Sequence, residues 1–291
     1  MIELSLSPFV DDLRFGEAPR WHEGRLWFSD QTDRRIHSVG SDGVLRLEHE
    51  LDFQPSGLGW LPDGRLLVVS MLDHRLLRAD GKGGFELVAE LASYCGGKLN
   101  DMIVDAAGHA YIGNIGFDEE NFDPSDEEFV LPATVLIRVD PDGSHRAVAE
   151  GLMCPNGMGV TGDGKTLVVG QSAAPEILGF DIDAKGELSG RRVYAKLPGE
   201  FGTDGMCLDA EGAVWSSDPP GQEFLRVLPG GEVTHRIDTG GRAAIACVLG
   251  GVDRRTFYAI TCSTMSHAAS LTQRGGSIGT VLVDVAGAGL P

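Results

Sequence analysis

The sequence predicts an all-β fold, a six-bladed β-propeller whose four-stranded blades surround a central channel and take up residues 1–291 as one domain. Two observations carry this prediction. A short segment recurs six times along the chain, at intervals of 39, 44, 56, 48 and 42 residues, and one four-stranded blade needs about 40 to 50 residues. Glycine is also frequent, at 41 of 291 residues, which indicates many tight turns between short elements.

Each copy of the repeat has the pattern of one β-hairpin. It opens with a small or polar residue and continues as two apolar runs around a turn such as PDG, AAG, GDG or AEG. Glycine in these turns permits the positive φ of a hairpin, and runs this short predict strands rather than helices. The copies begin at Glu17, Ser56, Asn100, Asn156, Asp204 and Ala246.

Further turn signals fall between the copies, where the outer hairpin of each blade is expected. They are Asp42-Gly43, Gly83-Gly84, Asp142-Gly143 and Gly230-Gly231. At the end of the chain we expect the last strand at residues 279–285, with the N-terminal IELSL pairing in the same blade. Such pairing closes the ring and removes the exposed sheet edges.

Two segments are longer than a minimal blade requires. Residues 116–134 lengthen the third repeat and carry seven carboxylates, and residues 261–277 extend the sixth. Solvated loops and lids over the channel mouth are the two interpretations open for them.

Composition excludes several classes of protein. The chain has 24 Lys and Arg against 43 Asp and Glu, a net charge of −19, which disfavours nucleic acid as a partner. It has neither an apolar run of membrane-spanning length nor the pattern of a signal peptide, so we expect a cytoplasmic protein without a membrane partner. Five cysteines without a CxxC pair indicate reduced thiols. No pattern indicates an oligomeric state.

The residue that opens each repeat has a special place in a propeller. The innermost strands line the channel, so these six residues are expected at one level around the axis. Four of them carry a carboxylate or a carboxamide: Glu17, Asn100, Asn156 and Asp204. Converging carboxylates and amides are hard ligands for a divalent cation, although Asn and Asp at strand starts also cap backbone groups. The lack of His and Cys at these positions argues against a His-rich zinc site.

The segments GEAPRWHEGRLWFSD, KLNDMIVDAAGHAYIGNIGF, PNGMGVTGDGKTLVV and TDGMCLDAEGAVW carry a family resemblance. In their order and spacing the chain resembles the family of senescence marker protein (regucalcin), gluconolactonases and luciferin-regenerating enzyme. The resemblance covers nearly the whole chain. It implies a six-bladed propeller that binds one divalent metal ion (calcium, zinc, magnesium or manganese) and hydrolyses a small lactone, such as a sugar lactone.

The resemblance also implies roles for individual residues. Glu17, Asn156 and Asp204 correspond to the metal ligands, and Asn100 to a ligand or a substrate-facing neighbour. Asp204 corresponds in addition to the catalytic acid/base. Family members acting on aldonolactones often have Arg two residues before the channel Asn, whereas this chain has Lys98, which keeps the charge but lacks the planar fork.

Lys98 and Asn100 are two residues apart, so strand alternation directs both side chains the same way, suited to holding a substrate. Asp101 is then expected on the opposite face, and it remains a second candidate for the base because a metal-bound Asp204 is a weak one. We therefore predict a metal-dependent lactonase. Two alternatives stay open: another reaction in the same channel (a different hydrolysis, a hydration or an isomerisation), or a non-catalytic metal-binding propeller.

Overall fold

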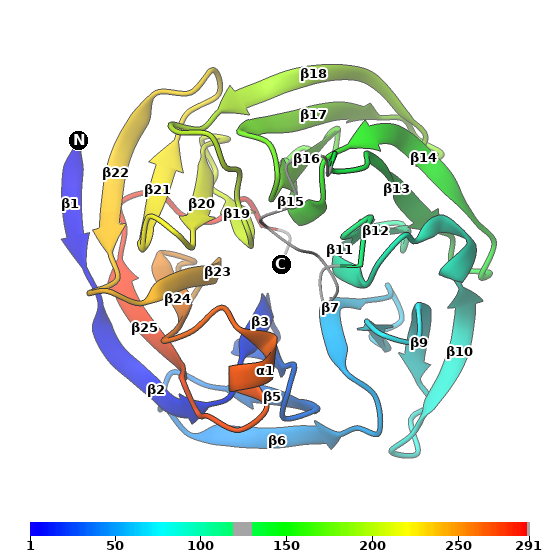
Figure 1. The fold of residues 1–291 in the computed structure, drawn as a ribbon, viewed down its shortest axis with the longest axis horizontal. Helices are drawn as coiled ribbons and strands as arrows, with labels where there is room; N and C mark the ends of the chain where they lie inside the picture. Colours follow the sequence, from blue (N-terminus) through cyan, green and yellow to red (C-terminus); the bar gives the residue numbers. More distant parts are fainter. Residues whose placement is uncertain (119–129, 290–291) are drawn as a thin grey trace.

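The computed structural model describes residues 1–118 and 130–289, and these residues form six β-sheets arranged as blades around a central axis (Figure 1). Within the blades, β3, β7, β11, β15, β19 and β23 lie nearest the axis, as Figure 1 shows. The predicted six-bladed propeller is confirmed.

The first three blades contain four antiparallel strands each. The first comprises β3 (Gly16–His22), β4 (Arg25–Asp30), β5 (Arg35–Val39) and β6 (Leu45–Glu50). The second comprises β7 (Pro55–Trp60), β8 (Leu66–Ser70), β9 (Arg75–Ala79) and β10 (Phe85–Glu90). The third comprises β11 (Leu99–Val104), β12 (Ala110–Asn114), β13 (Thr134–Val139) and β14 (His145–Leu152).

The last three blades follow the same order, with additions from the N-terminus. The fourth comprises β15 (Pro155–Val160), β16 (Thr166–Gln171), β17 (Glu176–Ile182) and β18 (Leu188–Lys196). The fifth comprises β19 (Met206–Leu208), β20 (Val214–Asp218), β21 (Glu223–Val227), β22 (Val233–Asp238) and β1 (Ile2–Ser5). The sixth comprises β23 (Ala243–Gly250), β24 (Thr256–Cys262), β25 (Gly276–Leu282) and β2 (Ser7–Leu13).

The N-terminus closes the ring, but not with the segment that the sequence suggested. The prediction that IELSL pairs in the last blade is wrong, because β1 pairs in parallel with β22 of the fifth blade. It is β2 that pairs with β25 and completes the sixth blade. Packing accompanies the arrangement: Leu4 contacts the cluster between the fifth and sixth blades around Trp215, whereas Leu13 is buried in the cluster between the sixth and first blades. β25 also begins three residues before the predicted strand.

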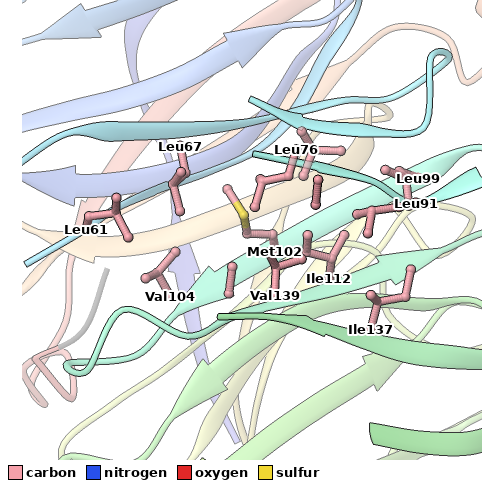
Figure 2. Packing of buried hydrophobic residues seen from close by; sticks show 13 residues of the cluster. Leu61, Leu67, Leu76, Leu91, Leu99, Met102, Val104, Ile112, Ile137 and Val139 are labelled. Atoms are coloured by element: carbon pink, nitrogen blue, oxygen red, sulfur yellow. The ribbon is translucent and has the colours of Figure 1, made fainter. Parts of the chain in front are cut away.

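Apolar side chains between neighbouring blades hold the inner strands in place. Figure 2 shows one such cluster, in which Leu67 and Leu76 of the second blade meet Leu99, Met102 and Ile112 of the third. These five side chains are at most 2% exposed, so truncating one of them to Ala is expected to cost about 2–5 kcal/mol. The packing fixes β11, the strand that carries Asn100.

Helix is sparse in the described ranges, which contain η1 (Ala92–Tyr94) and α1 (His267–Ser270). Neither of these two is long and apolar enough to cross a lipid bilayer. The five cysteines all lie in these ranges and are thiols rather than disulfide partners.

Candidate active site

Irregular pairing marks the channel end of the inner strands. Five of the six described inner strands have a register shift beside the residue that opens the repeat, namely between Glu17 and Arg20, Pro55 and Leu58, Leu99 and Met102, Pro155 and Met158, and Ala244 and Ala246. In the fifth blade, Asp204 precedes the first paired residue of β19. A bulge changes the direction in which side chains point at the end of a strand. In these five blades, the residue that opens the repeat in the sequence therefore lies beside a repeated irregularity of the backbone.

A cavity of about 580 Å³ opens at this end of the channel, and Glu17, Asn100, Asn156 and Asp204 line it together. The four carboxylate and carboxamide residues of the repeat position therefore meet in one place. The other two residues at that position lie outside the lining: Ser56 is buried, with its hydroxyl 3.4 Å from Gln31 Nε2, and Ala246 packs against Gly205. Of the six residues predicted to lie at one level around the channel, four therefore form the cluster in the cavity.

Glu17 is a buried carboxylate with another carboxylate as its neighbour. It is 7% exposed, and burial, reinforced by the negative charge of Asp204, raises the pKa of Glu17 well above 4.5. The backbone N–H of Ala18 donates to Glu17 Oε2 at 2.9 Å, which opposes the shift in part. The cluster therefore has an excess of negative potential that a bound cation would relieve.

Asn156 connects this pair to the neighbouring blade. Its Nδ2 donates to Asp204 Oδ1 at 2.5 Å and to Ser172 Oγ at 3.0 Å. Its Oδ1 is buried and has no hydrogen-bond partner in the described part of the chain. Leaving a buried acceptor unpaired costs about 1–3 kcal/mol. This oxygen therefore indicates a binding site for a group that interacts with its lone pairs, such as a cation.

A glycine makes the approach of Asn156 to Asp204 possible. The backbone N–H of Gly157 donates to the carbonyl oxygen of Asp204 at 3.1 Å. A Cβ at Gly157 would lie 2.4 Å from the backbone nitrogen of Met206, so a larger residue would push the two inner strands apart.

Lys98 and Asn100 enter the same cavity, as their spacing suggested. Lys98 lies just before β11 and is 9% exposed, and its carbonyl oxygen accepts from the backbone N–H of Ile115 at 2.9 Å. Asn100 Nδ2 lies 3.5 Å from the carbonyl oxygen of Pro155. A lysine and an amide therefore stand beside the carboxylates.

Asp101 does not line this cavity. Its Oδ1 lies 2.5 Å from Arg20 Nη2 and accepts the backbone N–H of Met102 at 2.8 Å. Arg20 also donates to the carbonyl oxygens of Pro19, Leu58 and Met102. Burial raises the pKa of Asp101, and the charge of Arg20 opposes that shift. The geometry makes Asp101 one half of a buried ion pair.

A further part of the lining could have been found from the sequence. The residues two positions before the channel residues in the first five repeats all line the cavity: Phe15, Gln54, Lys98, Cys154 and Gly202. The family resemblance points to this offset only at Lys98, although the repeat applies it to every blade. Arg20 had no such signal, because no other repeat has an arginine at the matching position.

The two long segments both reach the mouth of the cavity. Met265 and Ser270, from the 261–277 segment, line it, which fits the interpretation of that segment as part of the channel entrance. Phe117 and Leu131, from the 116–134 segment, also line it. Residues 119–129, with most of the predicted acidic insertion, lie outside the described residues.

The donor set fits a divalent cation. Within the described ranges no three His, Cys, Asp or Glu residues gather in a metal-binding group, so the candidate set depends on amide oxygen as well as carboxylate. It consists of the carboxylates of Glu17 and Asp204 and the unpartnered Oδ1 of Asn156. Hard oxygen donors of this kind suit calcium, magnesium or manganese, with water completing the shell.

Fold and site together define a class: a six-bladed propeller with a cavity lined in part by a cluster of oxygen donors. Within that class, the chain belongs to the SMP-30/Gluconolactonase/LRE-like family, whose model matches residues 15–263. The family resemblance drawn from the sequence is confirmed.

Individual relatives agree with this assignment. The chain is 27% identical to pentonolactonase XacC of Haloferax volcanii over 85% of this chain and 81% of that protein. It is 26% identical to a 6-deoxy-6-sulfogluconolactonase of Pseudomonas putida over 87% of this chain and 85% of that protein. The crystal structure of a regucalcin from Agrobacterium tumefaciens, a calcium-binding protein, superposes with a TM-score of 0.80 at 22% identity, covering 100% of this chain and 98% of the other.

Proposed function

We propose that the channel site binds one divalent cation and hydrolyses a small lactone. The unpartnered Oδ1 of Asn156, beside two carboxylates on the floor of a cavity of small-molecule size, is the observation that carries the proposal. The names of two relatives, a pentonolactonase and a sulfogluconolactonase, support lactone opening as the reaction.

Glu17, Asn156 and Asp204 are the residues that would hold the ion, which we expect to be calcium, magnesium, manganese or zinc. Such an ion supplies Lewis acidity and lowers the pKa of water bound to it. The charge of the set is consistent with this, because two carboxylates and a neutral amide leave an excess of negative charge without the cation.

Asp204 is the proposed acid/base. It takes a proton from the attacking water as the new C–O bond forms, and it returns a proton to the ring oxygen as the lactone C–O bond breaks. The product is a hydroxy acid, so atoms and charge balance without a further reactant. The hydrogen bond from Asn156 Nδ2 holds the Asp204 carboxylate in one orientation during both transfers.

Lys98 and Asn100 are the proposed substrate-binding residues. The Lys98 ammonium is the cationic group of the described cavity lining, where it favours the developing oxyanion and then the carboxylate of the product. As a point charge on a flexible stem, it recognises that carboxylate without the bidentate geometry of Arg. The Asn100 amide supplies one donor and one acceptor to the same substrate.

The experiment is a rate assay on a panel of γ- and δ-lactones, monitored with a pH indicator. The protein is first treated with chelator and then reconstituted with each divalent ion in turn. Turnover that disappears on chelation and returns with one ion would support both the reaction and the cation. A folded protein that binds an ion but opens none of the lactones would contradict the proposal and favour another reaction or a binding role.

A further inference from the structure

The cavity above the oxygen cluster has a second, different surface. Its wall contains Phe15, Met71, Ile115, Phe201 and Met265, which come from five different connections between strands. The polar residues Glu17, Asn100, Asn156 and Asp204 line the same cavity, so polar and apolar side chains both face it. A ligand that fills the cavity meets both.

Two of the apolar side chains are unusually exposed in the free protein. Phe201 is 65% exposed and Met265 is 52% exposed, although both line the cavity. Large apolar side chains left open at the mouth of a small-molecule cavity indicate a surface that becomes buried when the ligand binds.

Several polar side chains of the wall are already engaged within the protein. The Gln31 amide donates to Ser56 Oγ, the Thr32 hydroxyl donates to the carbonyl oxygen of Ser270, and the Thr203 hydroxyl donates to that of Ser217. These groups hold the connections together. These donated hydrogen bonds are therefore used within the protein, and Gln31 Nε2 keeps a second N–H.

The lining also lacks side chains that combine a flat face with hydrogen-bond donors. In the part of the chain that the structure describes, it contains no Arg, His, Tyr or Trp, and the sequence of residues 119–129 contains none of these types either. Arginine offers bidentate hydrogen bonds, and Tyr and Trp combine an apolar face with a polar group. Phenylalanine and methionine offer apolar contact alone.

We infer that the preferred substrate is a lactone whose ring carries an apolar substituent, such as an alkyl chain, rather than a polyhydroxylated sugar lactone. The ester group lies at the oxygen cluster with Lys98, and the substituent lies against Phe201 and Met265. This inference rests on the proposed lactonase function and specifies its substrate class. It distinguishes the preferred substrate of this chain from the sugar lactones that the names of its relatives indicate.

The test compares kcat/KM for a homologous series from γ-butyrolactone to γ-nonalactone with that for glucono-δ-lactone. Since each buried methylene is worth about 0.8 kcal/mol, kcat/KM is expected to rise by up to about fourfold for each added methylene. Phe201→Ser and Met265→Ser are each expected to flatten this rise. Val252→Ser, which removes an exposed apolar side chain outside the lining, is the matched control.

The possible results separate the two proposals. Flat rates along the alkyl series, together with faster opening of glucono-δ-lactone, would overturn the apolar substrate class and leave the lactonase function intact. A steep series that neither serine variant changes would also overturn it, because the apolar wall would not be what recognises the chain. Failure to open any lactone would instead overturn the lactonase function itself.

Discussion

Two buried carboxylates near the channel, Glu17 and Asp101, are in opposite electrostatic surroundings. Asp101 faces the Arg20 guanidinium at 2.5 Å, so its charge is compensated within the protein. Glu17 has the negative charge of Asp204 as its main electrostatic neighbour, and the nearby Asn156 Oδ1 has no partner in the described residues. Burial alone therefore does not identify a functional carboxylate. Asp101 is paired with a cationic side chain within the protein, whereas Glu17 faces a second carboxylate.

The largest expected effect comes from replacing Asp204. Asp204→Asn should lower kcat/KM for the best lactone by about a thousandfold, because general acid–base groups contribute roughly 10²- to 10⁴-fold. Steady-state assays of the reconstituted protein measure this. Asp163→Asn, in an exposed turn, is the matched control and should leave the rate unchanged. A loss of less than tenfold in Asp204→Asn would remove Asp204 from the catalytic role.

Breaking the compensated pair should affect stability strongly. Arg20→Met leaves Asp101 buried without its partner, and the free energy of unfolding should fall by about 3–5 kcal/mol in urea titrations. The double change Arg20→Met/Asp101→Leu removes both charges and should recover much of that loss. If Arg20→Met were as stable as the wild type, Arg20 would not be the group that compensates the charge of Asp101.

The uncompensated cluster should respond to cations instead. Adding calcium at a hundred times its Kd to chelated protein should raise the free energy of unfolding by about 2.7 kcal/mol, since the ion binds only the folded state. Thermal unfolding with and without calcium measures the shift. Glu17→Gln should reduce the shift, whereas Glu50→Gln, an exposed carboxylate outside the lining, should not. Equal shifts in both variants would place the ion elsewhere.

The raised pKa of Glu17 predicts a pH dependence in the absence of metal. The pKa of Glu17 is near 4.5 in the unfolded chain and higher in the folded protein, so the folded state binds this proton more tightly. The stabilisation that results is fully present below pH 4.5. That contribution is lost as the pH rises through the raised value, by about 1.4 kcal/mol per pH unit within this window. Chelated wild type should therefore lose stability relative to Glu17→Gln as the pH rises. Parallel curves for the two proteins would contradict the shift.

The smallest effect is expected for Asp101→Asn. The amide oxygen still accepts from Arg20, and residue 101 lies outside the cavity lining, so kcat/KM should change by less than about threefold. The assay is the same as for Asp204→Asn. If the rate collapses at a temperature where circular dichroism shows the variant to be folded, Asp101 and not Asp204 is the base.

The sequence predicted the features that the repeat determines. The six blades follow from the spacing of the copies, and the meeting of Glu17, Asn100, Asn156 and Asp204 follows from their common repeat position. Features that depend on single contacts could not be predicted in this way. The pairing of β1 with β22 depends on where Leu4 packs, and the Arg20–Asp101 pair joins blades one and three without any repeated pattern.

The most direct test of the central claim is a crystal structure of the protein grown with manganese, with an anomalous difference map to locate the ion. A single strong peak bonded to oxygens of Glu17, Asn156 and Asp204 is the predicted result. A map with no peak at this cluster, from protein that binds manganese in solution, would contradict the claim that the uncompensated carboxylates form the cation site.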